Sequence, residues 1–179
     1  MAAKMTITEA LAEIKTITAR IEKKRAAVMP YLVRDGRVID PHEKDGGSVG
    51  FVGRERQGIH DLEERLVAIR TAIQRKNLDT SLTLEGETRS LAAWLTWRRE
   101  VSAGSKTFLS SIASHIQGHR QRERGRSFVQ PGNELTKPED IIVAVNEAAL
   151  SAEIEQMETL LGTLDGKLSL LNATITIDI

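Results

Sequence analysis

Hydrophobic residues recur at helical spacing in four long stretches of this 179-residue chain. The first predicted helix begins at Thr6, where Glu9 completes a capping-box pattern. It ends near Met29, because Pro30 disfavours helical backbone in the residue before it. Its apolar face consists of Ile7, Leu11, Ile14, Ile17, Ile21 and Val28. This stretch therefore predicts an amphipathic helix.

Two further helices follow from the same spacing. The second is predicted over residues 54–76, with a seam formed by Ile59, Leu62, Leu66, Ile69 and Ile73. The third starts near Thr88 or Ser90 and reaches about Gln117. Its apolar stripe consists of Leu91, Trp94, Leu95, Arg98, Val101, Phe108, Ile112 and Ile116. Gly104 is the candidate kink of this helix, because small residues flank it.

The clearest pattern lies between Asn146, a predicted N-cap, and the end of the chain. Seven apolar residues alternate at intervals of four and three over three heptads: Leu150, Ile154, Met157, Leu161, Leu164, Leu168 and Leu171. Such a seam is buried either in the core of its own chain or against another copy of the chain. The sequence leaves both alternatives open.

Short β-prone runs lie between these helices. Aliphatic residues flank Asp35-Gly36, a strong turn signal, and predict a β-hairpin between Tyr31 and Ile39. The glycine-rich stretch that follows, 40–53, is predicted to be flexible. Three more runs predict strands at 80–84, 141–145 and 174–179. Because each of these three abuts a helix end, we expect them to pair in one small antiparallel sheet.

The predicted fold is mainly α: a long-helix antiparallel bundle or coiled coil with a small antiparallel β-sheet at one end. Aromatic residues make up only 3% of the chain, which favours slim helical packing built on aliphatic side chains. We expect a single helical domain over residues 1–179 with two excursions. These are a β-hairpin and flexible loop at 30–56 and a flexible basic loop at 118–137.

Composition narrows the classes of function. Lysine and arginine together number 25, and so do aspartate and glutamate, so global attraction to nucleic acid or to an anionic membrane is not indicated. Because the chain has no cysteine, disulfides, thiolate metal ligands and cysteine nucleophiles are excluded. Residues 1–15 lack the apolar run of a signal peptide, and no stretch approaches the roughly 18 apolar residues of a membrane span. These features predict a soluble, cytoplasmic protein.

No arrangement of residues in the sequence indicates catalysis. His115 and His119 are spaced like metal ligands on a helix, but no third ligand lies near them, so we expect no metal site. The glycine-rich run at 45–50 lacks the Gly-Lys-Ser/Thr ending of a phosphate-binding loop. We therefore expect neither enzyme activity nor a cofactor.

Two sets of residues are candidates for contacts with partners. Trp97, which lies beside two arginines, fits a protein interface and a core position equally well. Ile175 and Ile177 belong to a terminal strand that is free to extend a sheet of another copy. The one dense basic cluster supplies candidate phosphate contacts at Arg120, Arg122, Arg124 and Arg126. Because charge is balanced elsewhere, nucleic acid is the less favoured partner.

Part of the chain resembles a known family. The run at 80–92, TSLTLEGETRSLA, is similar to the strand, glycine turn and helix start of the septicolysin-like family. The end of the chain resembles it too: VNEAAL at 145–150 opens a leucine-seamed helix that leads through LNA into TIT at 171–176. The resemblance covers about residues 62–179, and the chain departs from the family at 30–56. It implies helices with a small sheet in a bacterial or phage-associated protein, and it carries over no catalytic residue.

These features together predict a non-enzymatic structural or assembly protein that acts through protein–protein contacts as a homo-oligomer and with other structural proteins. A phage virion or a step of virion assembly is the setting that the resemblance implies, so we expect the protein in the cytoplasm of a bacterial host or in a virion. The alternative is a small nucleic-acid-associated protein that uses the arginine-rich segment 119–126. Salt separates the two, because phosphate contacts weaken steeply as salt rises whereas an apolar seam does not.

Overall fold

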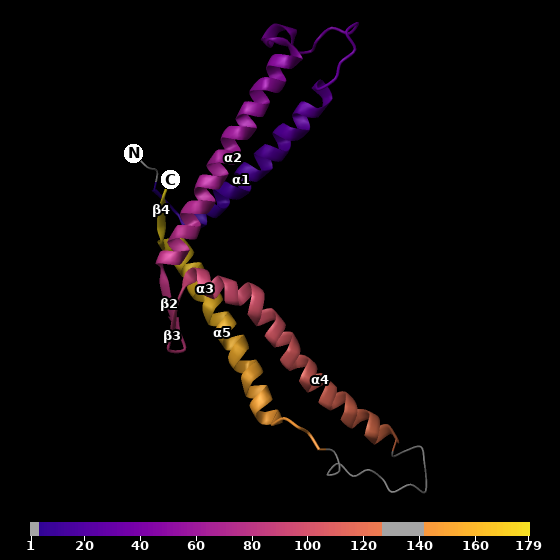
Figure 1. The fold of residues 1–179 in the computed structure, drawn as a ribbon, viewed down its shortest axis with the longest axis vertical. Helices are drawn as coiled ribbons and strands as arrows, with labels where there is room; N and C mark the ends of the chain where they lie inside the picture. The colour runs from indigo at the N-terminus through magenta and orange to yellow at the C-terminus, as the bar shows by residue number, and fades with distance from the viewer. Residues whose placement is uncertain (1–3, 127–141) are drawn as a thin grey trace. The chain divides into compact units, whose positions relative to one another are not determined.

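The computed structural model describes residues 4–126 and 142–179, the last four residues of the first range by their backbone alone. These residues are mainly helical and include two small antiparallel sheets (Figure 1). The chain forms two compact units: unit 1 is Met1–Thr80 with Leu168–Ile179, and unit 2 is Ser81–Lys167.

Unit 1 is built on two long antiparallel helices, α1 (Ile7–Val28) and α2 (Gly47–Asp79) (Figure 1). The predicted capping box at the start of α1 is confirmed. Thr6 Oγ1 accepts a hydrogen bond from Glu9 N (3.2 Å), and the Glu9 carboxylate accepts one from Thr6 N (2.7 Å). α1 ends at Val28, one residue before the end that Pro30 predicted near Met29.

The two ends of the described chain meet in the sheet of unit 1. Strand β1 (Lys4–Thr6) pairs antiparallel with β4 (Thr176–Asp178), which follows the last helix, α5 (Glu147–Thr174). Met5 lies opposite Ile177 in this ladder. The strand predicted at the C-terminus is therefore confirmed, but its partner is β1 of the same chain.

Isoleucines of α1 form most of the core of unit 1. The buried cluster consists of Ile7, Ala10, Ile14, Ile17, Ile21, Ile69 and Ile177. Ile59, Leu62, Leu66 and Ile73 of α2 pack against this cluster and are partly buried. The predicted apolar faces of the first two helices are confirmed, except at Leu11, which is exposed.

The segment between α1 and α2 differs from its prediction. It contains two short 3₁₀ helices, η1 (Met29–Tyr31) and η2 (Glu43–Asp45), and no strand forms anywhere from residue 29 to residue 46. Asp35 does begin a turn, since its carbonyl accepts a hydrogen bond from Val38 N (3.1 Å). The predicted hairpin is wrong because the aliphatic residues on either side of this turn do not pair with each other.

The predicted flexible stretch is also wrong over much of its length, because α2 begins at Gly47 and includes all the later glycines of the stretch. Helix formation there follows from a cap supplied from outside the helix. The Asp40 carboxylate accepts a hydrogen bond from Ser48 N (2.8 Å), one of the free amide groups in the first turn of α2. Glycine content alone did not reveal this cap.

Unit 2 begins with a tight hairpin formed by β2 (Ser81–Leu84) and β3 (Glu87–Ser90). Glu85 and Gly86 turn the chain with φ values of 46° and 83°, the left-handed pair that suits a two-residue hairpin loop. The strand predicted at 80–84 is confirmed, whereas β3 was not predicted.

Helix α3 (Leu91–Thr96) follows β3 directly, with Ser90 as its N-cap, one of the two predicted helix starts. Trp94 of this helix is buried, as predicted. Its indole Nε1 donates a hydrogen bond to Leu82 O (2.8 Å), and the Arg89 guanidinium carbon lies 4.8 Å from its ring centroid. The hairpin and α3 therefore anchor the largest buried side chain of unit 2.

A π-helix, η3 (Trp97–Ser102), joins α3 to α4 (Ala103–Arg126) and changes which residues of α4 are buried. A π-turn accommodates one residue more than an α-turn, so every later residue is displaced by one position around the helix. Phe108 of the predicted stripe is 66% exposed, whereas Leu109 is 7% exposed.

The same displacement of one residue is already seen at the end of η3. Val101 of the predicted stripe is exposed, whereas its neighbour Ser102 is buried. The irregularity that was predicted at Gly104 therefore lies in η3, just before it. The predicted stripe is wrong at Val101 and Phe108 because the sequence does not mark the π-turn, and its odd member Arg98 is exposed as well. Ile112 and Ile116 of the stripe are half-buried, as predicted.

The leucine-rich seam of α5 faces protein within the chain. Asn146 caps the helix as predicted, since its Oδ1 accepts a hydrogen bond from Ala149 N (3.1 Å). All seven seam residues are buried or half-buried, and Leu150, Leu164 and Leu168 are buried. Of the two alternatives for this seam, the structure favours a core position.

Two further predictions about loops and strands are wrong. Residues 118–126, predicted as the start of a flexible basic loop, belong to α4, because this run has no proline and consists mainly of residues that favour helix. The rest of that predicted loop, 127–137, lies outside the described residues.

Of the strand predicted at 141–145, residue 141 lies outside the described part, and residues 142–145 do not form a strand. β-Branched residues favour a strand only where a partner strand is present. The single predicted sheet is replaced by the separate pairs β1–β4 and β2–β3.

Candidate interaction site

The segment 29–49 leads from the end of α1 into the start of α2 (Figure 1). It carries six exposed large aliphatic residues, and we call it the apolar tip. Its exposed large side chains are Met29, Leu32, Val33, Val38, Ile39 and Val49. Val33 is 89% exposed, Ile39 81% and Val49 87%. Large aliphatic groups exposed together in one short segment make it a candidate interaction surface.

Asp40 holds the apolar tip in one conformation. Its carboxylate accepts hydrogen bonds from Ser48 N (2.8 Å), Ser48 Oγ (2.7 Å) and His42 N (2.9 Å), and Arg34 Nε lies 3.6 Å away. The backbone hydrogen bond from Ser48, followed by that from His42, lowers the pKa of Asp40 to about 2. Gly47, whose φ is +70°, lies so close that a Cβ there would be 3.3 Å from Asp40 Oδ2.

An aromatic cluster supports the same segment. The ring of His42 stacks on Phe51, with centroids 4.1 Å apart and planes 4° from parallel. Tyr31 meets both rings edge-on, 4.6 Å from His42 and 5.2 Å from Phe51. His42 Nε2 is buried without a hydrogen-bond partner in the described structure. These contacts join η1, the N-cap residue of η2 and the N-terminal part of α2.

Charged side chains of the apolar tip are bound within the chain. Arg37 and Asp35 form an ion pair of 2.8 Å, Arg34 Nη1 donates to Val38 O (2.7 Å), and Arg54 Nη1 of α2 donates to Asp45 O (2.9 Å). The tip contains the bases Arg34, Arg37 and Lys44 and the acids Asp35, Asp40, Glu43 and Asp45. It therefore presents aliphatic groups without an excess of positive charge.

The structure does not bring the predicted interface residues together. Trp97 is half-buried in unit 2, where its ring meets that of Trp94 edge-on at 5.8 Å. Ile177 is 3% exposed, and Ile175 packs against the core of unit 1. The prediction that Ile175 and Ile177 form a free interface is wrong, because β4 is already paired and its side chains fill the core.

The predicted phosphate contacts lie on a helix and are spread around it. Arg120 forms an ion pair with Glu147 in which Nη1 lies 2.8 Å from Oε2, and Arg122 Nε donates to Gly118 O (3.2 Å). Positions two apart on an α-helix point about 200° apart, so 120 and 124 lie on one side and 122 and 126 on the other. The side chains of Arg124 and Arg126 lie outside the described residues.

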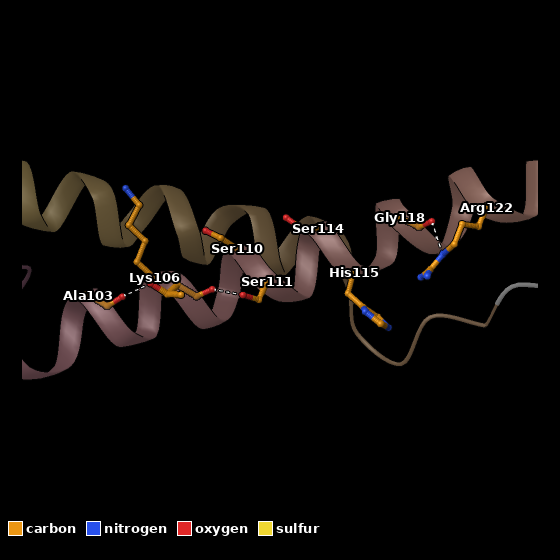
Figure 2. Close-up of a pocket in the computed structure, with 9 residues that line it drawn as sticks. Ala103, Lys106, Ser110, Ser111, Ser114, His115, Gly118 and Arg122 are labelled. Carbon is orange, nitrogen blue, oxygen red and sulfur yellow. Dashed lines mark hydrogen bonds between the residues drawn. The ribbon is translucent and has the colours of Figure 1, made fainter. Parts of the chain in front are cut away.

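A polar stripe runs along α4, as Figure 2 shows, from Ala103 through Lys106 and the serines to Arg122. The lining residues that the structure describes all belong to this one helix. Ser111 Oγ donates to Thr107 O (2.8 Å) and Thr107 Oγ1 donates to Ala103 O (2.9 Å), so these hydroxyls are bound within the helix. The stripe has the geometry of a solvated helix face.

A hollow of about 550 Å³ lies between α4 and residues 142–145. Ile112, Ile116 and Val143 supply apolar lining, and His115 and His119 lie at its edge. Both histidines are exposed, and among the described residues no group of three or more His, Asp or Glu is placed to hold a metal ion. The hollow is apolar and does not provide a set of metal ligands.

Comparisons of the chain with protein-family models, with curated proteins and with solved structures give no match. No helix among the described residues is long and apolar enough to cross a membrane. The resemblance to the septicolysin-like family accordingly stays a prediction. The apolar tip was not predicted because Val33, Val38 and Ile39 were assigned to paired strands. The available signal for an exposed segment was that these aliphatic residues flank the Asp35-Gly36 turn.

Proposed function

We propose that this is a non-enzymatic structural or assembly protein that acts through protein–protein contacts, both with copies of itself and with other structural proteins. The observation that carries the proposal is the apolar tip, where large aliphatic side chains lie exposed on a segment fixed by Asp40 and by the stack of His42 on Phe51. Covering such groups yields about 25 cal/mol per Å² of apolar surface. A fixed segment also loses little conformational entropy on binding.

The charges of the tip support a protein as the partner. Binding to nucleic acid needs an excess of Lys and Arg that releases counterions from the phosphates, and an anionic membrane attracts the same excess. The apolar tip has three bases against four acids, and its Arg37 is already paired with Asp35. Arg120 of the predicted phosphate cluster is likewise paired, with Glu147.

The biological setting is the second part of the proposal. A role in a phage virion or in virion assembly rests on the resemblance of residues 80–92 and 145–176 to the septicolysin-like family. The apolar tip lies in 30–56, where the chain departs from that family, so the contact surface and the setting are supported by different parts of the sequence.

Light scattering after size exclusion tests the proposal on the full chain. We expect a mass above 19.8 kDa that is the same at about 0.05 M and about 1 M salt, because apolar contacts are not screened. The control is the double variant Arg122→Ala/Arg124→Ala, whose mass should equal that of the parent chain. A monomer at all concentrations, or a multimer that dissociates as salt rises, would contradict self-association through apolar surface.

A further inference from the structure

We infer that α4 has two packing registers within unit 2, and that loss of the π-turn in η3 converts the described register into a second one in which α4 is rotated by about 100° about its own axis. The described register is the major one. In the second, α3 and α4 form one regular α-helix. This inference concerns unit 2 and does not rest on the apolar tip or on the proposed function.

Two pairs of neighbouring residues show what the rotation exchanges. In the described register Ser102 is 3% exposed and Val101 47%, while Leu109 is 7% exposed and Phe108 66%. Without the π-turn, each later residue takes the place around the helix that its successor occupies now. Val101 would then take the buried place of Ser102, and Phe108 that of Leu109. The second register therefore buries the residues that regular helical spacing predicts.

The apolar residues of α4 are divided between the two registers. The described register buries Leu109 and half-buries Ile116. The second register buries Val101 and Phe108 instead and brings His115 into the place of Ile116. Because apolar burial stabilises a register in proportion to the area it covers, the gain of one pair offsets the loss of the other. The two registers are therefore close in free energy.

Ion pairs between α4 and α5 favour the described register. Lys106 Nζ lies 2.7 Å from Glu158 Oε1, and Arg120 Nη1 lies 2.8 Å from Glu147 Oε2. A rotation of about 100° would carry both bases away from these carboxylates. Partly exposed pairs of this kind contribute little individually, so they bias the equilibrium without abolishing the second register.

The other contacts of α4 permit the rotation. Leu109 is the one buried large hydrophobic residue of α4 among those described. The hydroxyls of Thr107 and Ser111 bind carbonyls of α4 itself, so these hydrogen bonds turn with the helix. Gly104, just after η3, has no heavy atom within 4 Å of the position that a Cβ would occupy, so the space around it is open.

Thiol labelling of the full chain tests the inference, because the chain has no cysteine of its own. Ser102→Cys places a nearly isosteric thiol at a buried position that would face solvent in the second register, where it takes the place of exposed Ala103. Its reaction with a maleimide measures how often α4 rotates. Ser110→Cys is the control, since Ser110 and its successor Ser111 are both exposed. We expect rapid labelling of the control and slower, complete labelling at position 102.

Loss of the ion pairs should raise the labelling rate at position 102. Lys106→Gln with Arg120→Gln removes contacts that only the described register makes, so we expect a rise of about fivefold. Arg122→Gln is the matched control, because Arg122 Nε donates to Gly118 O of the same helix, and it should leave the rate unchanged. An equal rise in the control would contradict the assignment of the pairs to one register.

Phe108→Ser in the Ser102→Cys chain decides between rotation and unfolding. Phe108 is exposed in the described register and buried in the second, so its loss should lower the labelling rate at position 102 about tenfold. Exposure by unfolding would not be slowed, because unfolding buries no side chain. Circular dichroism checks that the variants are folded. A labelling rate that Phe108→Ser leaves unchanged or raises would overturn the inference, and so would the absence of labelling at position 102 in the folded chain.

Discussion

Units 1 and 2 are each built from two long antiparallel helices and a two-stranded sheet, yet they bury their side chains differently. In unit 1 the isoleucines of α1 and the seam of α2 form one continuous cluster. In unit 2 the buried hydrophobic residues are Leu84, Leu91 and Trp94 in and beside the hairpin, Leu109 on α4, and Leu150 and Leu164 on α5. Leu109 is the one buried large hydrophobic residue of α4 among those described.

The difference follows from the residue types at the helix contacts. α1 places isoleucine at nearly every buried position, and branched side chains fill the space between two helices. η3 and α4 place Ser102 and Ser105 on their less exposed side, and the links of α4 to α5 include exposed ion pairs such as Lys106–Glu158. Exposed ion pairs contribute about 0–1 kcal/mol each. We therefore expect unit 1 to have the more stable helical pair.

The largest expected effect is the loss of a core side chain in unit 1. Ile69→Ala removes a fully buried side chain from the isoleucine cluster and should lower the free energy of unfolding by about 3 kcal/mol. Urea unfolding followed by circular dichroism measures the change. Because both tryptophans lie in unit 2, their fluorescence follows that unit separately. A loss below about 1 kcal/mol would show that the cluster is loosely packed.

A matched pair in unit 2 tests the displacement caused by η3. Leu109→Ala should lower the free energy of unfolding by about 2 kcal/mol, whereas Phe108→Ala should change it by less than about 0.5 kcal/mol, because Leu109 is buried and Phe108 is exposed. Tryptophan fluorescence in urea compares the two variants. The opposite order would mean that α3 and α4 form one regular helix without a π-turn.

The helix caps should contribute equally to the free energy of unfolding in the two units, so they serve as a control for the comparison. Thr6→Ala removes the capping box of α1, and Asn146→Ala removes the cap of α5; each should cost about 1 kcal/mol. Thermal unfolding of both variants measures these losses. A much larger effect at one cap would indicate that the packing around it, rather than the cap, decides the stability of that helix.

The smallest expected effect is confined to the apolar tip and to acid. The pKa of Asp40 is lowered to about 2 by its hydrogen bonds from Ser48 and His42. Its stabilising contribution is therefore complete above about pH 4 and is lost as the pH falls through about 2. The amide resonance of Ser48 should titrate with a midpoint near pH 2. Asp40→Asn should abolish that titration, and an unchanged midpoint in the variant would assign it to another group.

Local signals in the sequence predicted much of the helical architecture. The capping box at Thr6, the cap at Asn146 and the seams of α1, α2 and α5 depend on residues within one or two turns of each other, so periodicity reveals them. The same is true of Trp94 as a core residue.

Features that depend on distant contacts were not predicted. The carboxylate of Asp40 caps α2 from a separate loop, and the start of the chain supplies the partner strand of β4. The π-turn leaves no mark in the pattern, since Val101 and Phe108 continue the expected stripe. The exposed apolar tip was missed for the same reason: whether Val33 pairs with a neighbouring strand or faces solvent is decided by the tertiary structure.

The π-turn of η3 holds one residue more than a regular helix would need to cover the same turn. A chain that is one residue shorter between Trp97 and Ser102 would therefore continue as a regular α-helix and would still place Leu109 inward. Every residue of α4 would keep the face it has now. A deletion at this place is thus absorbed by the loss of the π-turn, whereas a regular helix through the unchanged sequence would turn α4 by about 100° and bring Phe108 inward instead.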